Sequence, residues 1–254
     1  MIAMNRDTRF LIDTVVAAAK LVRDDFRVIR KGDDGDLVTT TDLEIERFII
    51  ERINTHYPQF SVVSEESSPD GMCADNCFVL DPLDGTINFA HGLPLWGIQV
   101  AMIRNGKPCV SVIYLPRLGE LYYADDTGAY LCENMSHGRL AIAPTKFRKI
   151  SVSKKSHVES LYLVEGGNKF PALGRLNDVS RHWRYFCCTA VNSAWVACGR
   201  LGGTILRKDN VWDWLPGQYL VQQAGGVVLN AEGAHICANT KDMAELLLSQ
   251  GRLE

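Results

Sequence analysis

The chain has 254 residues and a formal charge of −3, from 27 Lys and Arg against 30 Asp and Glu. Its content of 46% hydrophobic and 22% charged residues is typical of a soluble globular protein and excludes a largely disordered chain. No run of about 20 apolar residues is present, which excludes a membrane-spanning helix. The slight acidity, without a block rich in Lys or Arg, argues against nucleic acid as a partner.

The eight cysteines do not predict disulfides or zinc. The polar residues from Asn5 to Arg9 do not resemble a secretory signal, so we expect a cytoplasmic protein with reduced thiols. The pair Cys73 and Cys77 lacks the spacing and the second pair of a zinc module.

The first residues of the chain predict helices. Between Phe10 and Phe26, apolar residues recur at three- and four-residue intervals, as in an amphipathic helix. Residues 31–40 are polar and predict a loop, and Thr41 with Glu44 matches a capping box at the start of a second helix. The loop therefore delivers Asp42 to a helix start.

Two short apolar runs then end abruptly in carboxylates. Phe60–Val63 is followed by Glu65, and Cys77–Leu80 is followed by Asp81. The runs predict two strands that open onto one polar edge of a sheet. Acidic side chains at the ends of strands predict a functional site at that edge.

The pattern of the remaining chain predicts a sheet and then a second half. Asn105-Gly106 between two apolar runs is a strong hairpin signal, and Glu120–Ala124 and Ala129–Cys132 extend it into an antiparallel meander. We expect an N-terminal half over residues 1–145 and a C-terminal half over 146–254, packed over one continuous cleft. The second half predicts strands at Ile150–Ser153, Leu161–Val164, Thr204–Leu206 and Val227–Leu229, and helices at Thr189–Ala197 and Trp214–Gln223.

The most informative segment is DPLDGTINF, which begins at Asp81. Asp81 and Asp84 lie on either side of a bend fixed by Pro82, and such a bend can aim both carboxylates at one point. Gly85 and Thr86 permit close approach of the backbone. A helix that begins there would offer free N–H groups to an anion such as phosphate.

Glu65 and Asp213 bring the predicted number of converging carboxylates to four. We expect Glu65 rather than Glu66 to reach the site, because adjacent side chains at a strand end point to different faces. Carboxylates and phosphate repel one another unless cations bind between them. Oxygen ligands without paired His or Cys favour Mg²⁺ or Mn²⁺ over zinc.

Such a site predicts metal-assisted phosphoryl chemistry with water as the nucleophile. Thr86 can position that water with Asp42 behind it, provided that the two side chains lie within hydrogen-bond reach.

These segments resemble the inositol monophosphatase family, within the lithium-sensitive, metal-dependent phosphatase superfamily that includes the fructose-1,6-bisphosphatases. The resemblance covers residues 31–230. It rests on the order and spacing of four motifs, which are Gly35–Asp42, Ser64–Ser67, Asp81–Phe89 and Trp212–Asp213 with Ala224–Gly226. It implies an α+β fold, a five-layered α/β/α/β/α sandwich with the site at the junction of its two halves.

The resemblance also implies roles for individual residues. The metal ligands would be Glu65, Asp81, the Leu83 carbonyl, Asp84 and Asp213, holding two or three Mg²⁺ ions, with Mn²⁺ as a substitute. Thr86 and Asp42 would orient the nucleophilic water with Glu65 as a further catalytic group, and Asp84, Gly85 and Thr86 would contact the substrate phosphate. Lys31 falls where family members carry a lysine near the site. Inhibition by lithium and a homodimer are further expectations from the family.

The predicted substrate pocket departs from the family pattern. Leu206 stands where inositol-specific members carry a glutamate that binds the inositol hydroxyls. Gly202 replaces the acid of a Gly-Arg-Leu-Asp segment, and Cys187-Cys188-Thr189 replaces a Gly-Ser/Thr-Ala segment of the pocket. We therefore expect a remodelled pocket.

The sequence thus predicts a cytoplasmic Mg²⁺-dependent phosphomonoesterase. Its substrate would be a small phosphorylated alcohol, an inositol, sugar or polyol monophosphate, and neither a membrane nor nucleic acid is expected as a partner. Histidinol phosphate, fructose bisphosphate and a 3′-phosphonucleotide stay open as substrates. Two other classes also stay open, namely a non-catalytic regulatory protein that binds metal and phosphate, and a metal-dependent phosphodiesterase.

Overall fold

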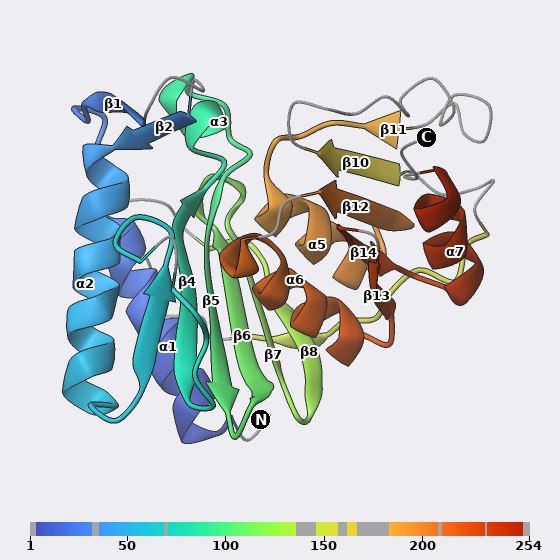
Figure 1. Cartoon of the computed structure of the whole chain (residues 1–254), viewed down its shortest axis with the longest axis horizontal. Coiled ribbons are helices and arrows are strands. Elements are labelled where there is room, and N and C mark those ends of the chain that lie inside the picture. The colour runs from blue at the N-terminus through green and yellow to red at the C-terminus, as the bar shows by residue number, and fades with distance from the viewer. Residues whose placement is uncertain are drawn as a thin grey trace.

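The computed structural model describes residues 4–31, 36–68, 71–135, 146–156, 162–166, 183–207, 210–231 and 233–250. Across these ranges the elements stack in five layers, in the order helices, sheet, helices, sheet, helix (Figure 1). This arrangement confirms the five-layered α+β sandwich that the sequence predicts.

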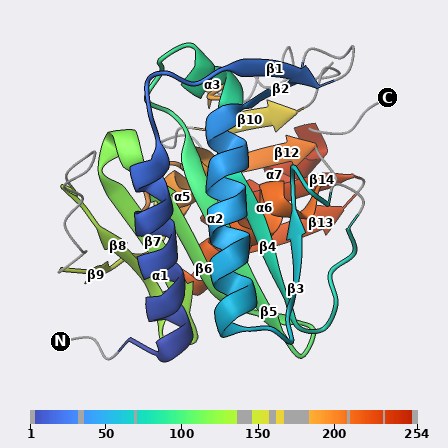
Figure 2. The same ribbon diagram turned by 90° about the vertical axis from the view of Figure 1, so that its left-hand side faces the viewer.

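Two helices form the first layer, α1 (Arg6–Ala18) and α2 (Thr40–His56). They lie side by side on the outer face of the larger sheet (Figure 2). α1 continues only through a short 3-10 turn, η1 (Ala19–Leu21), so the predicted helix up to Phe26 is too long. Val22 is extended and packs with Phe26 against the same core, which explains why the apolar spacing continues beyond the helix.

The predicted loop and capping box before α2 both need correction. Residues 31–40 are not one loop, because β1 (Val28–Lys31) pairs antiparallel with β2 (Asp36–Thr39) and β2 leads directly into α2. The capping box is formed by Thr39 and Asp42, not by Thr41 and Glu44. Asp42 nevertheless lies in the first turn of α2, as predicted.

Among the described residues, the larger sheet has seven strands, in chain order across the sheet. They are β3 (Ser61–Ser64), β4 (Cys77–Asp84), β5 (Gly97–Arg104), β6 (Lys107–Leu115), β7 (Glu120–Asp125), β8 (Gly128–Cys132) and β9 (Arg148–Lys149), with η2 (Pro116–Leu118) between β6 and β7. β3 and β4 are parallel, and the other pairs are antiparallel. The hairpin is confirmed, since Asn105 and Gly106 have φ of 52° and 72°, as its tight turn requires.

The smaller sheet has five strands within the described ranges, and their directions are mixed. Its order is β11 (Trp183–Arg184), β10 (Tyr162–Gly166), β12 (Gly203–Arg207), β14 (Ala234–Ala238) and β13 (Val227–Ala231). α7 (Lys241–Gln250) covers its outer face. The sequence did not predict β11, β14 and α7. The predicted strands near residues 161, 204 and 227 are present as β10, β12 and β13. Residue 161 itself lies outside the described ranges.

A strand over Ile150–Ser153 was predicted wrongly. Only β9 just before it joins the sheet, and Val152 instead donates its N–H to the carbonyl of Ala224, 3.1 Å away at the end of α6. Ile150 is buried and still donates its N–H to the Ala129 carbonyl of β8 at 2.9 Å, whereas Val152 is only partly buried and has left the ladder. The sequence pattern does not show where the strand ends. The division of the chain at residue 145 stays a prediction.

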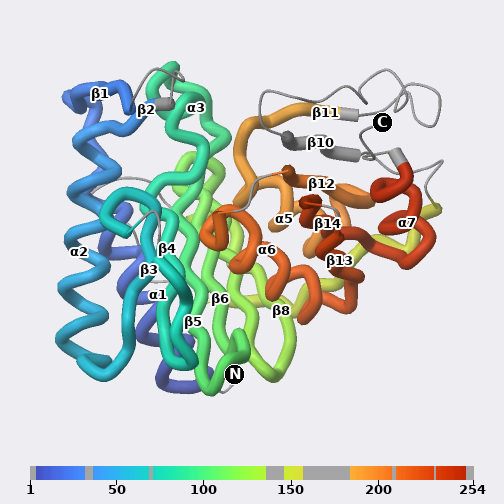
Figure 3. The backbone as a smooth tube through the Cα atoms, in the orientation of Figure 1, coloured from blue at the N-terminus to red at the C-terminus, as the bar shows by residue number. Residues whose placement is uncertain are grey.

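The middle layer consists of α5 (Thr189–Ala197) and α6 (Val211–Gln223), which lie between the two sheets (Figure 3). Both helices bury most of their residues because each is covered on two sides. α6 begins three residues before the predicted start at Trp214, so that Asp213 belongs to its first turn. No helix among the described residues is long and apolar enough to cross a membrane.

Candidate metal centre and active site

Three buried carboxylates meet where β4 and α6 approach each other. Asp81, Asp84 and Asp213 each offer an oxygen, and these oxygens all lie within 4.8 Å of one another. In a regular strand, residues three apart point to opposite faces. Here the pairing of β4 with β5 shifts register between Asp81 and Asp84, and this irregularity allows both carboxylates to face Asp213.

Asp84 is fixed by the start of α5. Its Oδ2 accepts hydrogen bonds from the Ala190 N–H, from the Thr189 hydroxyl at 3.1 Å and from the Cys188 thiol at 3.2 Å. Cys188 is the N-cap residue of α5 and makes no capping hydrogen bond of its own to the helix. A carboxylate from β4 therefore replaces the usual cap, and the positive end of the helix stabilises its charge.

Asp81 is oriented by its own bend and by the neighbouring strand. Its Oδ1 accepts the Leu83 N–H at 3.0 Å, and its Oδ2 lies 3.5 Å from Nε2 of Gln99 on β5. Gln99 also donates to the Thr189 hydroxyl at 3.1 Å. The same few side chains thus hold Asp81 and Asp84 together.

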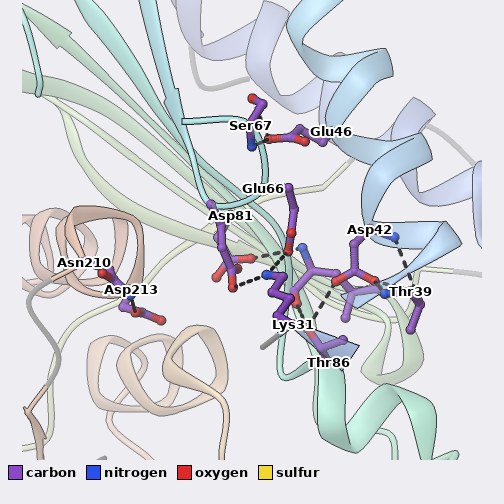
Figure 4. Close-up of polar contacts among 12 residues, drawn as sticks. Lys31, Thr39, Asp42, Glu46, Glu66, Ser67, Asp81, Thr86, Asn210 and Asp213 are labelled. Carbon is purple, nitrogen blue, oxygen red and sulfur yellow. Dashed lines mark hydrogen bonds and ion pairs between the residues drawn. The ribbon is translucent and has the colours of Figure 1, made fainter. Parts of the chain in front are cut away.

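Glu65 lies beside the three aspartates and not among them. Lys31 contacts both neighbouring glutamates. Its Nζ lies 3.2 Å from Oε1 of Glu65. It lies 2.5 Å from Oε1 of Glu66 (Figure 4). Burial raises the pKa of Glu65, and the charges of Glu66 and Asp213 raise it further, against the opposing charge of Lys31. Burial alone would lower the pKa of Lys31, but the two glutamates outweigh it and raise that pKa. The lysine therefore stays protonated and compensates part of the negative charge.

Thr86 and Asp42 are in direct contact, as a water-orienting pair requires. The Thr86 hydroxyl lies 3.1 Å from Oδ1 of Asp42 (Figure 4). It also lies 3.0 Å from the Leu83 carbonyl. The other Asp42 oxygen accepts the Thr39 N–H at 2.9 Å and the Thr39 hydroxyl. Burial raises the pKa of Asp42, while the hydrogen bonds from Thr39 and Thr86 oppose that rise.

Gly85 occupies a position that only glycine tolerates without strain. Its φ is +87°, and a Cβ there would lie 2.9 Å from the carbonyl oxygen of Leu95. The five-residue helix α3 (Thr86–Ala90) begins directly after it. This conformation sets the direction of the chain from Asp84 into Thr86.

The predicted pocket residues lie in two places. The Cys188 thiol and the Thr189 hydroxyl face Asp84, and Thr189 also lines a small cavity with Leu206. Cys187 adopts a φ of +51°, and its carbonyl lies 3.5 Å from the Asn88 amide nitrogen. Asn88 was not assigned a role from the sequence, yet it is buried and also donates to the Phe186 carbonyl at 2.6 Å.

Glu46 is a second residue that sequence reasoning missed. Its Oε1 accepts both the N–H and the hydroxyl of Ser67, each at 3.0 Å (Figure 4). Glu46 lies four residues after Asp42 on α2, so both carboxylates share one face of the helix. On that face, Asp42 holds the Thr86 hydroxyl. Glu46 holds Ser67 and with it the turn that carries Glu65 and Glu66. The four-residue spacing of Asp42 and Glu46 in the sequence indicates that they share a helix face. It does not indicate that Ser67 is the hydrogen-bond partner of Glu46.

Comparison with known proteins identifies the family. The model of the inositol monophosphatase family matches residues 4–252. The chain belongs to the inositol monophosphatase family. Members of this family are phosphatases that act on phosphoric monoesters, and the chain is a hydrolase of this class. The sequence prediction of both family and enzyme class is thereby confirmed.

Individual relatives show how far the similarity extends. The chain is 30% identical over 213 residues to the "Fructose-1,6-bisphosphatase/inositol-1-monophosphatase" of Thermotoga maritima, covering 82% of this chain and 76% of the relative. It is 32% identical over 214 residues to "Nus factor SuhB" of Escherichia coli, covering 81% and 76%. The crystal structure of extragenic suppressor protein SuhB from Bartonella henselae superposes with a TM-score of 0.82 at 26% identity, covering 98% of this chain and 99% of that one.

We expect Glu46→Gln to weaken metal binding more than turnover. The amide keeps the size of the side chain but removes the charge that accepts both hydrogen bonds from Ser67, so the turn carrying Glu65 loosens. A hydrogen bond to a charged group contributes about 1.5–3 kcal/mol, and the amide oxygen of the variant keeps part of this energy. We therefore expect the Mg²⁺ concentration for half-maximal activity to rise by about fivefold to tenfold. A titration of activity with Mg²⁺ measures this.

Glu51→Gln is the matched control, because Glu51 is on the same helix and exposed. If Glu46→Gln and Glu51→Gln show the same Mg²⁺ dependence, Glu46 does not position the site.

Proposed function

We propose that the chain is a Mg²⁺-dependent phosphomonoesterase that hydrolyses a small inositol, sugar or polyol monophosphate. The observation that carries this proposal is the group of three buried carboxylates whose oxygens lie within 4.8 Å, next to the Thr86 and Asp42 pair. A buried cluster of like charges is unfavourable unless a cation binds it. The family relationship supplies phosphate-ester hydrolysis as the chemistry.

The residues present fit a hard divalent cation. Asp81, Asp84 and Asp213 provide carboxylate oxygens, and this donor set favours Mg²⁺ or Mn²⁺ over zinc. Glu65 and the Leu83 carbonyl are the further ligands we propose, for two or three ions in total. When bound, such cations polarise the phosphoryl oxygens and lower the pKa of water.

The protein groups around this cluster have distinct parts in the reaction. Thr86 orients the attacking water, and Asp42 fixes the Thr86 hydroxyl through the hydrogen bond at 3.1 Å. Asp42 is fully buried and held by Thr39, so its position is set before substrate arrives. The backbone N–H groups of Gly85 and Thr86 hold the phosphate. Asp84, held by α5, keeps one wall of the site in place.

Several finer properties follow from the same proposal. Cys73, Cys77, Cys109, Cys132, Cys198 and Cys237 are free thiols, which supports a reducing compartment and hence the cytoplasm. A homodimer and inhibition by lithium are carried over from the family. Gel filtration tests the dimer, and activity at increasing millimolar lithium tests the inhibition.

The proposed activity is tested by phosphate release with Mg²⁺ and with EDTA. The panel contains inositol, sugar, polyol and histidinol monophosphates, fructose 1,6-bisphosphate, a 3′-phosphonucleotide and the diester bis(p-nitrophenyl) phosphate. We expect Mg²⁺-dependent release from a polyol or sugar monophosphate, and a loss of at least about 10³-fold in Asp213→Asn because a metal ligand is removed. Equal turnover with EDTA, or faster turnover of the diester, would contradict the proposal.

Removal of the Thr86 hydroxyl distinguishes the contribution of water orientation to activity from the contribution of metal binding. We expect Thr86→Val to lower kcat by about 10²–10⁴-fold, the range for one positioned proton-transfer group, with little change in the Mg²⁺ requirement. Steady-state kinetics at saturating Mg²⁺ measure this. Thr86→Ser keeps a hydroxyl and is expected to retain much more activity. Equal kcat in wild type and Thr86→Val would show that another group orients the water.

A further inference from the structure

Two of the clustered carboxylates are joined by a hydrogen-bonded link that runs through neighbouring side chains. Gln99 on β5 lies directly opposite Asp81 on β4, so the two side chains share one face of the sheet. α5 packs against β5 and places its first residue, Thr189, beside Gln99. Thr189 in turn contacts Asp84, so the link runs from β4 through β5 and α5 back to β4.

The chemistry of the groups determines the direction of each hydrogen bond in this link. Nε2 of Gln99 lies 3.5 Å from Oδ2 of Asp81 and 3.1 Å from the Thr189 hydroxyl, and its two hydrogens serve both acceptors. The Thr189 hydroxyl donates its own hydrogen to Oδ2 of Asp84 at 3.1 Å. The reversed amide would place a carbonyl oxygen against the Asp81 carboxylate, so the contacts favour this orientation.

The link is buried and depends on one atom of Gln99. Gln99 is fully buried, and Thr189 is 7% exposed. Oε1 of Gln99 has no hydrogen-bond partner within the part of the chain that the structure describes, and an unpaired buried acceptor costs free energy. The polar contribution of this side chain to the site therefore comes from the two hydrogen bonds of Nε2.

The Thr189 part of the link departs from the family pattern. Thr189 stands at the alanine of the Gly-Ser/Thr-Ala segment, and alanine has no hydroxyl that could join Gln99 to Asp84. The Cys188 thiol and the Ala190 N–H also donate to Asp84, and they attach it to the start of α5. The Thr189 hydroxyl additionally connects Asp84 to the side chain that contacts Asp81.

Linked carboxylates restrict the size of the cation that a site accommodates. Mg²⁺ requires nearly ideal octahedral geometry with oxygens at about 2.0–2.1 Å, whereas Ca²⁺ accepts variable geometry with oxygens at about 2.3–2.6 Å. Selection between the two ions depends on the size and the flexibility of the site. Two carboxylates that cannot move apart separately therefore favour the smaller ion.

We propose that Gln99 and Thr189 are positioning residues that fix the separation of Asp81 and Asp84 and thereby make the metal centre selective for Mg²⁺ over Ca²⁺. This inference rests on the proposed function, because it concerns the cations of the same site. Gln99 and Thr189 act through the carboxylates that they hold, as the outer hydrogen-bond partners of metal ligands do in general.

Competition with Mn²⁺ measures this selectivity without turnover. The electron paramagnetic resonance signal of free Mn²⁺ shows how much of the ion the protein binds, and Mg²⁺ or Ca²⁺ is added until half of the bound Mn²⁺ is released. The two titrations give the ratio of the Ca²⁺ dissociation constant to the Mg²⁺ dissociation constant. We expect Asp84→Asn, which removes a proposed ligand, to lose the bound Mn²⁺ and so to show that it lies in the cluster.

Gln99→Met and Thr189→Val each remove one part of the link with little change in side-chain volume. We expect each to raise the Mg²⁺ dissociation constant by about tenfold, the effect of losing an outer partner of a metal ligand. The Ca²⁺ dissociation constant is expected to rise by no more than about threefold, because Ca²⁺ accepts flexible ligands. The ratio then falls by at least about threefold. Thr189→Ser keeps the hydroxyl and is expected to retain the wild-type ratio.

Thr8→Val is the matched control. The Thr8 hydroxyl on α1 donates to Oδ2 of Asp125 on β7 at 3.0 Å, and both residues are buried. The substitution therefore removes the same kind of hydrogen bond, from a threonine to a buried aspartate that does not belong to the carboxylate cluster. We expect the ratio in Thr8→Val to equal that of wild type.

The results separate this inference from the proposed function. An unchanged ratio in either Gln99→Met or Thr189→Val overturns the inference, because the link needs both residues, and leaves the phosphatase proposal intact. An equal fall of the ratio in Thr8→Val also overturns it, because a general loosening of the fold then explains the change. Wild type that binds no Mn²⁺ contradicts the proposed metal centre, and the inference with it.

Discussion

The mutual repulsion of buried carboxylates at the junction of the two sheets is the constraint on which this structure depends. Asp81, Asp84 and Asp213 are each at most 6% exposed, and their oxygens lie within 4.8 Å. Such an arrangement costs folding free energy unless other groups stabilise the charges. The protein meets part of this cost with the N-terminus of α5 at Asp84 and with Lys31 at the neighbouring glutamates. The divalent cations that we propose would neutralise the remaining charge.

The helices around the cluster have two roles, because they cover the sheets and also hold the side chains of the site in position. α2 packs on the larger sheet and uses one polar face, with Asp42 and Glu46, to hold Thr86 and Ser67. α5 lies between the two sheets, and the backbone of its first turn binds Asp84. The same packing that buries the core therefore sets the distances within the site, as a preorganised active site requires.

Local signals in the sequence predicted much of the fold and of the site. The bend at Pro82 brings Asp81 and Asp84 together as expected, and the hairpin at Asn105-Gly106 follows from residues that tolerate positive φ. Contacts between segments that are distant in the sequence could not be predicted from these local signals. The hydrogen bonds from α5 to Asp84 join residues more than 100 positions apart, and Asn192 lies beside Leu206 and Asp213 only because α5 packs over β12 and α6. The roles of the site residues stay predictions until they are tested.

The most direct test of the account is to locate Mn²⁺ by anomalous diffraction in crystals of the protein grown with Mn²⁺ and phosphate. The account predicts at least one Mn²⁺ ion in direct contact with carboxylate oxygens of Asp81, Asp84 and Asp213, with phosphate beside Gly85 and Thr86. An anomalous map without a peak among these three carboxylates, from a protein that hydrolyses phosphomonoesters in Mn²⁺, would contradict it.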